Sequence, residues 1–375
     1  MESLWYRNPQ TGIIQPMDEF ARPEGNKFQG YYRNRDGFGG CRIELREFAT
    51  DSALALLRIA DPVQTDLVQG YSLPETIGDN LMTPKKMAKE SGRFPAFGKE
   101  SFFIPGDLKR AVGAPVSRLA TQNGYVLMGL SEFAEGVGIE NRERNEWAGS
   151  PDLLITSKLN TVVARIARYR ELSQAILLTT YANYATGNYA TGASLKWATT
   201  GDPIHDIRQL VLQVRKTAGQ SPKDGWCTPT TWELIINNAT VKQTLKGLVN
   251  FGSLEAEMIT PKMFAAACQL NNWYVGYATY STDSASIITD GAVNGGAVTD
   301  GYIWEAVNSS CAGVIIKGTG GGIEPAFGYT WERQNSPIVE SYYENRTKSQ
   351  IWDYEHFFTA AITLNTAGAM YYSIA

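Results

Sequence analysis

The hydrophobic pattern of the chain is dominated by one helical stretch of unusual length. From residue 152 to residue 186, apolar side chains recur at three- and four-residue steps, which predicts one buried helix face: Ile155, Leu159, Val162, Ile166, Tyr169, Leu172 and Ile176. The opposite face is expected to be polar: Lys158, Arg165, Arg168, Arg170 and Glu171. Ser150-Pro151-Asp152 is a start signal and Gly187 a stop signal. At 1.5 Å per residue such a helix is roughly 50 Å long.

After this helix, the pattern changes to short helices and strands. Asp202-Pro203, Thr228-Pro229 and Thr260-Pro261 predict three helix starts, and Gly219 predicts the end of the first helix. Trp226-Cys227 and Trp273–Tyr277 are expected to be short strands. The Gly-, Ala-, Ser- and Thr-rich residues 279–301 predict an exposed loop. This part of the chain therefore indicates a compact α/β block.

Before the long helix, the pattern predicts a strand at Leu81–Met87 and then a two-stranded excursion over residues 91–134. Arg93–Ile104 is extended and rich in aromatic residues, and Asn123-Gly124 precedes the return strand Tyr125–Met128. Since an isolated hairpin is marginally stable in water, we expect it to lie on another subunit. The candidate contact residues on it are Phe94, Phe97, Phe102 and Phe103.

The two ends of the chain differ in character. Residues 1–80 mix glycine, arginine and aromatic residues without a period, which predicts an extended arm with one short helix at Asp51–Ile59. Trp5, Tyr31 and Tyr32 are expected to pack against neighbouring protein. The C-terminal part predicts an antiparallel set of strands: 312–317, 337–345, 356–364 and 368–374.

Composition narrows the functional class. The formal net charge is -4, and charged residues make up only 19% of the chain, below the usual quarter, which favours a surface covered in an assembly. The four cysteines are far apart, so we expect small buried apolar residues and no zinc or redox motif. The chain has no run of about 20 apolar residues, so no membrane span is predicted. The first residues lack the pattern of an ordinary secretory signal.

Motifs for catalysis or cofactor binding are weak. Gly318–Gly322 follows a predicted strand but is not followed by Lys-Ser or Lys-Thr, so a flexible turn is the better interpretation than a phosphate loop. The two histidines, His205 and His356, have no metal-ligand spacing. Acid pairs such as Glu332 with Glu340, or Asp353 with Glu355, leave a carbohydrate-active enzyme as an alternative. We otherwise expect no catalytic residues, no cofactor and no metal.

Several short motifs occur in an order that resembles a known family. Lys196-Trp197 is followed by Asp202-Pro203-Ile204-His205-Asp206-Ile207, and then by Gly219-Gln220-Ser221-Pro222. Trp226–Trp232, Leu270–Tyr280 and Tyr302-Ile303-Trp304 complete the series. Over residues 80–375, this order is similar to that of tailed-bacteriophage major capsid proteins with the Hong Kong 97 fold. Lys223 replaces the asparagine usual after the proline, and the arm matches no pattern of the family.

The resemblance implies an α+β fold, the Hong Kong 97-like major capsid fold, with four parts. Residues 1–80 would be the N-terminal arm and 92–133 the extended loop. Residues 203–325 would form the axial domain around the symmetry axis of each capsomer. The peripheral domain would consist of 81–91, 134–202 and 326–375, with the long spine helix at 152–186. The implied function is structural: self-assembly into the icosahedral head that encloses the genome of a tailed double-stranded DNA phage.

The resemblance also implies partners. These are other copies, in pentamers and hexamers, together with portal, scaffold and possible decoration proteins, and DNA held by weak nonspecific contact. No membrane partner is expected; the location is the virion, after assembly in the host cytoplasm. Some relatives join subunits covalently, which makes Lys99 or Lys109 a candidate amine and Asn345 or Asn365 its target. The shell of an encapsulin-type nanocompartment, which shares this fold, is the second alternative.

Overall fold

The computed structural model describes residues 5–7, 14–16, 29–31, 43–44, 59–60, 64–65, 75–96, 124–147, 151–249, 258–281, 300–319 and 325–374. The chain divides into two compact units, Met1–Ile59 and Ala60–Ala375. In the first unit, β1 (Trp5–Arg7) pairs antiparallel with β2 (Ile14–Pro16) and β3 (Gln29–Tyr31), and β3 pairs with β4 (Ile43–Glu44). The short strand β5 (Ile59–Ala60) spans the boundary.

The expected arm, residues 1–80, is too long at its C-terminal end. Residues 75–80 belong to the second unit, where the short helix α3 (Gly78–Leu81) buries Gly78 and Leu81. The reason is a tertiary contact, because the backbone N–H groups of Ile77 and Gly78 donate to a buried carboxylate on the long helix. The predicted strand at Leu81–Met87 is shorter and begins later, as β6 (Pro84–Met87). The predicted helix at 51–59 lies outside the described residues, apart from Ile59.

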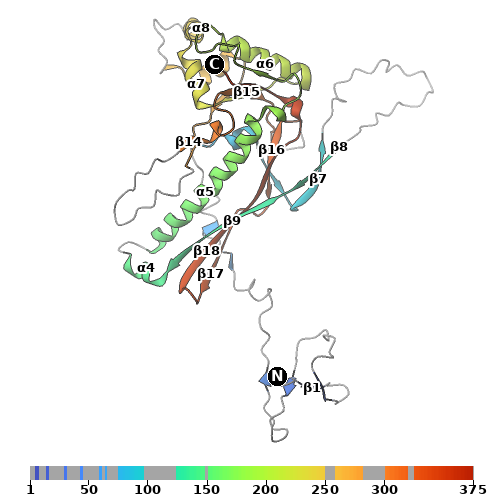
Figure 1. Cartoon of the computed structure of the whole chain (residues 1–375), viewed down its shortest axis with the longest axis vertical. Helices are drawn as coiled ribbons and strands as arrows, with labels where there is room; N and C mark the ends of the chain where they lie inside the picture. The colour runs from blue at the N-terminus through green and yellow to red at the C-terminus, as the bar shows by residue number, and fades with distance from the viewer. Residues whose placement is uncertain are drawn as a thin grey trace, which may run out of the picture. The chain divides into compact units, whose positions relative to one another are not determined.

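The long helix, α5 (Pro151–Thr179), connects the two parts of the second unit (Figure 1). It begins where predicted but ends seven residues earlier than residue 186, so its length is about 43 Å at 1.5 Å per residue. Its last carbonyls are bound by side chains that follow: Asn183 Nδ2 donates to Leu177 O (2.9 Å) and Tyr184 Oη to Leu178 O (2.7 Å). These contacts turn the chain into the 3₁₀ helix η3 (Tyr181–Asn183).

Part of the predicted face assignment of α5 is wrong. Tyr169 (51% exposed) and Ile176 are exposed although they fit the apolar spacing, whereas Arg170 and Glu171 are largely or fully buried. The other apolar positions at the N-terminal half are buried as predicted, including Ile155, Leu159, Val162 and Ile166. The helix therefore has an apolar face in its first half and a polar, buried contact in its second half.

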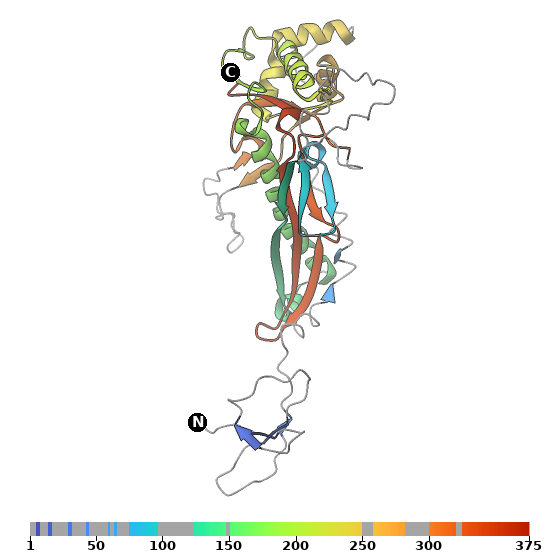
Figure 2. The same ribbon diagram turned by 90° about the vertical axis from the view of Figure 1, so that its right-hand side faces the viewer.

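A long sheet lies against one face of α5 (Figure 2). Its central strand is β18 (Ser349–Ile362), which pairs antiparallel with β9 (Ser131–Glu140), β17 (Ile338–Glu344) and β16 (Gly328–Arg333). β6 pairs parallel with β16. Val339, Trp352 and Phe358 of this sheet pack on the buried apolar side chains of α5. The short helix α4 (Asn141–Glu146) joins β9 to the segment before α5.

A second sheet forms the core of the α/β block at the other end of α5. Its strand order is β10-β19-β15-β11-β12, and its ranges are β10 (Tyr189–Thr191), β19 (Gly368–Tyr372), β15 (Cys311–Ile315), β11 (Asp224–Cys227) and β12 (Asn272–Val275). The helices of this block are α6 (Pro203–Ala218), α7 (Pro229–Asn237), α8 (Ala239–Val249) and α9 (Pro261–Ala267). β13 (Thr279–Ser281) pairs with β14 (Asp300–Tyr302), and η5 (Ile303–Glu305) follows.

Predicted helix starts in this block are confirmed, but one prediction about the strands is wrong. α6, α7 and α9 begin at the prolines after Asp202, Thr228 and Thr260, and Gly219 adopts a left-handed φ of 69° just after α6. The C-terminal strands do not form a single antiparallel set. β15 and β19 pair in one sheet and β17 and β18 in the other, because η6 (Asn365–Ala367) redirects the chain between β18 and β19. The pattern of single strands carries no information on this change of partner.

Three cysteines are free and buried as predicted: Cys227, Cys268 and Cys311. Burial raises the pKa of the Cys227 and Cys268 thiols, so both behave as apolar core groups. Among the described helices, none is long and apolar enough to span a bilayer.

Candidate assembly surfaces

A two-stranded stem leaves the second unit next to the long sheet. β7 (Ser91–Ala96) pairs antiparallel with β8 (Gly124–Gly129), from Ser91 opposite Gly129 to Ala96 opposite Gly124. Leu130 N donates to Glu90 O (2.7 Å) at the base of the stem, and β9 begins immediately afterwards at Ser131. The structure thus confirms the two-stranded form of the predicted excursion. Residues 97–123 between the two strands lie outside the described residues.

Arg170 of α5 connects the helix to two other elements through ion pairs. Its guanidinium donates to Asp79 Oδ1 of α3 (2.8 Å and 3.0 Å) and pairs with the Glu332 carboxylate of β16. Lys86 Nζ of β6 lies 2.6 Å from the other oxygen of Glu332. Burial alone would raise the pKa of Glu332, but Arg170 and Lys86 outweigh it, so the pKa is lowered. Glu332 is therefore an ionised, paired carboxylate.

Glu171 of α5 makes a second connection, to α3 and η5. Its carboxylate is 2% exposed and accepts hydrogen bonds from Ile77 N (2.9 Å), Gly78 N (2.9 Å) and Trp304 Nε1 (2.7 Å). Burial raises the pKa of Glu171, and the three donors act against that shift. A Cβ at position 78 would lie 2.7 Å from Glu171 Oε2, so any larger residue there would displace the carboxylate. The carboxylate thereby holds α5, α3 and η5 together.

Gln174, one turn further along α5, completes this polar contact. Its amide donates to Asp79 Oδ1 and to Thr330 Oγ1, each at 2.7 Å. The three side chains Arg170, Glu171 and Gln174 thus fix α5 to the strand, the short helix and the 3₁₀ turn around it. We call this set the α5 junction. It is the place where the long sheet and the α/β block meet through one helix.

His356 of β18 lies beside the α5 junction in a buried position. Its Nε2 is 3.9 Å from Glu332 Oε1 and has no hydrogen-bond partner in the described part of the chain, and its Nδ1 is 3.3 Å from Tyr354 Oη. Burial first, and then the Arg170 charge, lowers the pKa of His356 to about 4. The imidazole is therefore neutral at neutral pH.

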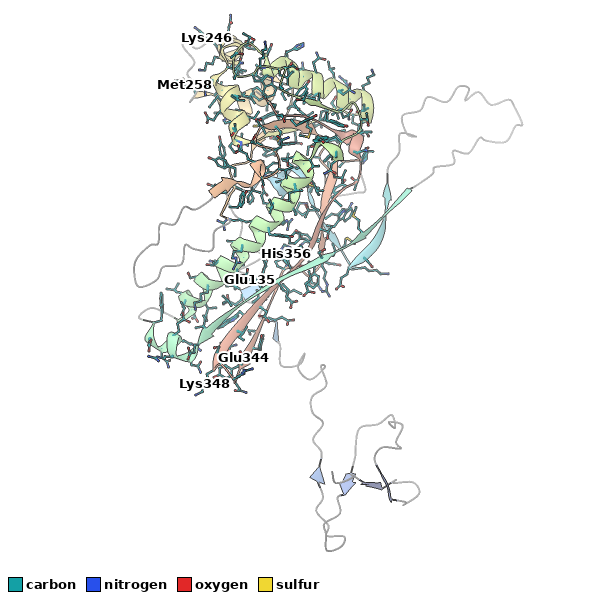
Figure 3. The ribbon with its side chains drawn as sticks, viewed as in Figure 1. Glu135, Lys246, Met258, Glu344, Lys348 and His356 are labelled. Carbon is teal, nitrogen blue, oxygen red and sulfur yellow. The ribbon has the colours of Figure 1, made fainter. Side chains whose placement is uncertain are left out.

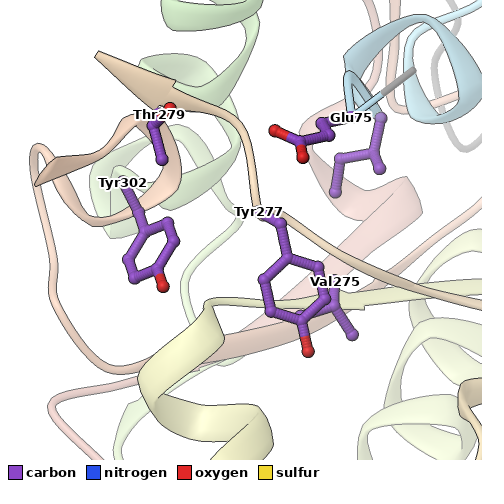
Figure 4. A pocket seen from close by; sticks show the side chains of 6 residues that line it. Glu75, Val275, Tyr277, Thr279 and Tyr302 are labelled. Carbon is purple, nitrogen blue, oxygen red and sulfur yellow. The ribbon is translucent and has the colours of Figure 1, made fainter.

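An open pocket lies between the segment before α3 and the β13–β14 pair (Figure 4). Its volume is about 540 Å³, and its lining residues are Glu75, Ile77, Val275, Tyr277, Thr279 and Tyr302. The rings of Tyr277 and Tyr302 meet edge-on, with centroids 6.5 Å apart, and both side chains are exposed. The Glu75 carboxylate points toward the space beside Tyr277 and Thr279. Exposed aromatic rings are typical of a protein contact surface.

The motifs that carry the family resemblance have structural roles in the α/β block. Trp197 is fully buried, and its Nε1 donates to Asp206 Oδ2 of α6 (2.8 Å). Thr228, before α7, bonds the Cys311 backbone of β15 through its N–H (3.1 Å). Trp304 donates to Glu171, as described above. The residues of these motifs therefore make contacts that close the core of the block and attach it to α5.

Sequence and structure comparisons agree. No protein-family model matches the chain. Over 237 residues, it is 29% identical to the major capsid protein of Burkholderia phage BcepMu, a match that covers 61% of this chain and 73% of that protein. A phage-related protein from Bordetella bronchiseptica RB50 superposes with a TM-score of 0.65 at 20% identity, over 84% of this chain and 98% of that one. This chain is similar to a phage major capsid protein.

The fold is that of the Bordetella phage-related protein, and it is an α+β fold of the kind that the motif order implied. A capsid chain of cyanophage P-SCSP1u is a more distant neighbour, with a TM-score of 0.49 at 13% identity over 81% of this chain and 90% of that one.

The candidate contact residues of this capsid relative fall into two groups. Phe94 lies on β7, Trp5 on β1 and Tyr31 on β3, where only the backbone is described. The others lie outside the described residues: Phe97, Phe102, Phe103 and Tyr32. Their contacts with other subunits remain predictions. The sequence pattern did not mark Glu75, Tyr277 or Tyr302 as contact residues, although both tyrosines belong to motifs noted above.

The structure describes the two candidate target asparagines of the cross-link. Asn345 is exposed at the turn between β17 and β18, and Asn365 is exposed in η6. Lys99 and Lys109 lie outside the described residues, so the cross-link remains a prediction.

The carbohydrate-active alternative gains no support from Glu332. Its carboxylate is buried and paired with two cations, and its pKa is lowered. A general acid requires a raised pKa. Within the described residues, no group of three or more His, Cys, Asp or Glu side chains could hold a metal ion.

Proposed function

We propose that this chain is a major capsid protein, which assembles into the icosahedral head of a tailed double-stranded DNA phage. The match to 73% of a phage major capsid protein carries the proposal. The fold supports it, because a capsid subunit needs no solute-binding centre but does need extended elements that reach its neighbours. The role is structural and not enzymatic.

The proposal assigns a place in the shell to each part of the second unit. Residues 203–325 surround the symmetry axis of pentamers and hexamers as the axial domain. α5 and the long sheet form the peripheral domain, and the 92–133 loop reaches a neighbouring subunit. The α5 junction supports this assignment, since it couples the two domains through buried ionic and hydrogen-bonded contacts.

Further partners follow from the same proposal. A closed phage head needs a portal, and commonly a scaffold or decoration proteins, while the packaged DNA is held by weak nonspecific contact. Assembly takes place in the host cytoplasm, and the finished protein is part of the virion.

Electron microscopy of the purified full-length chain tests this function. Closed icosahedral particles are expected, and a protein that stays monomeric at all concentrations and salt conditions would contradict the proposal. Particles isolated from the native producing cell decide between the two shell functions. Nuclease-protected double-stranded DNA supports the phage head, whereas an enzyme cargo without DNA supports the encapsulin-type alternative.

A further inference from the structure

The pocket described above, which we call the tyrosine pocket, has the chemistry of a site for a cationic and aromatic segment. Two exposed tyrosine rings form one wall, and Glu75 supplies a carboxylate. In the described part of the chain, Glu75 has no ion pair. Burial raises the pKa of Tyr277, and Cys227 and the carboxylate of Glu233 raise it further. Glu233 is therefore a second acid close to the pocket. Tyrosine rings and carboxylates together favour lysine and arginine side chains and further aromatic rings.

Residues 97–123 of this chain have the complementary composition. They hold four cations, Lys99, Lys109, Arg110 and Arg118, against two acids, Glu100 and Asp107, which gives 4 - 2 = +2 in a chain whose net charge is -4. The same segment contains Phe97, Phe102 and Phe103. Charge and aromatic content thus match the tyrosine pocket on both counts.

The placement of the two features within the second unit makes this contact an intermolecular one. The β7–β8 stem, from which residues 97–123 continue, and the β13–β14 pair at the pocket lie on opposite flanks of α5 (Figure 1). Subunits in a ring meet head to tail, so that one flank of each copy faces the opposite flank of the next. In such a ring, the flank that carries the β7–β8 stem therefore faces the pocket of the neighbouring copy.

We infer that the tyrosine pocket is the socket for residues 97–123 of the adjacent subunit in the shell. In this contact, a cationic side chain of the segment lies against Tyr277 and Tyr302 and pairs with Glu75, while its phenylalanines cover the rest of the opening. The inference rests on the proposed capsid function and adds the receiving site on the neighbour.

Photo-cross-linking of assembled particles tests the inference. p-Benzoylphenylalanine replaces Tyr302 in one variant and Tyr277 in another, and mass spectrometry identifies the peptides joined on illumination. The control position is Tyr343, an exposed tyrosine beside Glu344 at the far end of the long sheet (Figure 3). We expect intersubunit products of the two pocket positions with residues 97–123, and none with this segment from position 343. Products of the pocket positions with any other segment, or no intersubunit product in intact particles, would overturn the inference.

A charge reversal gives a second readout that does not depend on the photo-reactive group. Glu75→Lys should lower the yield of particles about tenfold, since it places a cation opposite a cationic segment. Glu132→Lys is the matched control, because Glu132 is an exposed acid of β9 away from the pocket. Both variants should show the circular dichroism spectrum of the parent. If Glu75→Lys assembles as well as Glu132→Lys, the socket is wrong even though the capsid function stands. If the parent chain forms no particles under any condition, the proposed function itself fails.

Discussion

At the scale of single residues, the α5 junction shows how polar groups can join parts of a subunit. Arg170, Glu171 and Gln174 are buried on a helix that would otherwise need apolar side chains there. Each has several partners: two carboxylates for the guanidinium, three donors for the carboxylate and two oxygens for the amide N–H groups. Because unpaired buried groups are costly, these contacts tolerate only one relative position of the elements they connect.

Replacement of Glu171 by glutamine should destabilise the folded subunit. The amide removes the charge and turns one acceptor into a donor, so at least one of Ile77 N, Gly78 N and Trp304 Nε1 loses its partner. We expect a loss of about 1–3 kcal/mol in the free energy of unfolding, measured by urea denaturation. Glu132→Gln makes the same chemical change at an exposed site and should be neutral. An equal effect of the two variants would mean that the three hydrogen bonds do not stabilise the junction.

The stability of the subunit should fall as the pH is lowered, in part because of His356. Its pKa in the folded chain is about 4, whereas a histidine in the unfolded chain titrates near 6.5. The unfolded state therefore takes up the proton first, and stability decreases between about pH 6.5 and pH 4, by up to about 3 kcal/mol. Urea midpoints of the parent and of His356→Phe at several pH values measure this term.

The difference between the parent and His356→Phe should change across that pH window and stay constant above it. His205→Phe serves as the control, since His205 is the other histidine and is exposed on α6. It should keep the pH dependence of the parent. A parent and a His356→Phe variant with parallel pH profiles would show that the imidazole is not buried in its neutral form.

At the scale of elements, α5 has two different halves. Its first half packs through Ile155, Leu159, Val162 and Ile166 on the long sheet, and its second half carries the α5 junction. The second half also places Ala175 and Leu178 in the core of the α/β block, but only this half carries buried polar contacts. This division explains why the simple apolar period predicted the first half correctly and the second half incorrectly.

A pair of leucines on α5 tests this division. Leu159 is fully buried, and Leu153, less than two turns earlier, is 67% exposed. Leu159→Ala should cost about 2–5 kcal/mol in the free energy of unfolding because it leaves a cavity against the sheet, while Leu153→Ala should be near neutral. Thermal and urea unfolding of the two variants decide the matter. Comparable losses would contradict the assignment of the buried face.

The sequence predicted local features, such as helix starts, more accurately than long-range contacts and strand pairing. Proline after Asp202, Thr228 and Thr260 marked the helix starts because the signal lies within a few residues. Glu171 could not be recognised as buried, since its donors are about 95 and 130 positions away in the chain. For the same reason, the strand β16 was missed and the sheet partners of β15 and β18 were not separated. Glu75 gave no signal at all, because a pocket requires three distant segments to meet.

At the scale of the whole molecule, the second unit is built to be completed by neighbours. The β7–β8 stem and the β13–β14 pair lie on opposite flanks of α5 (Figure 1), and exposed apolar side chains occur well away from the core: Trp147, Leu153, Met258 and Tyr343. Contacts between copies would cover them.

Removal of the excursion should separate folding from assembly. A variant in which Gly-Asn-Gly replaces residues 97–123 keeps the β7–β8 stem and should unfold at the same urea concentration as the parent. It should remain unassembled, because the contact with the neighbouring subunit is lost. Analytical ultracentrifugation gives both the oligomeric state and the homogeneity of the product. Normal particles from this variant would show that the excursion is dispensable for the shell.

The most direct test of the account is a cryo-electron microscopy reconstruction of the particles formed by the full-length chain. The account predicts a closed icosahedral shell in which residues 203–325 surround the fivefold and sixfold positions and α5 with the long sheet lies between them. Particles without icosahedral order, or a shell in which residues 203–325 lie away from those axes, would contradict it.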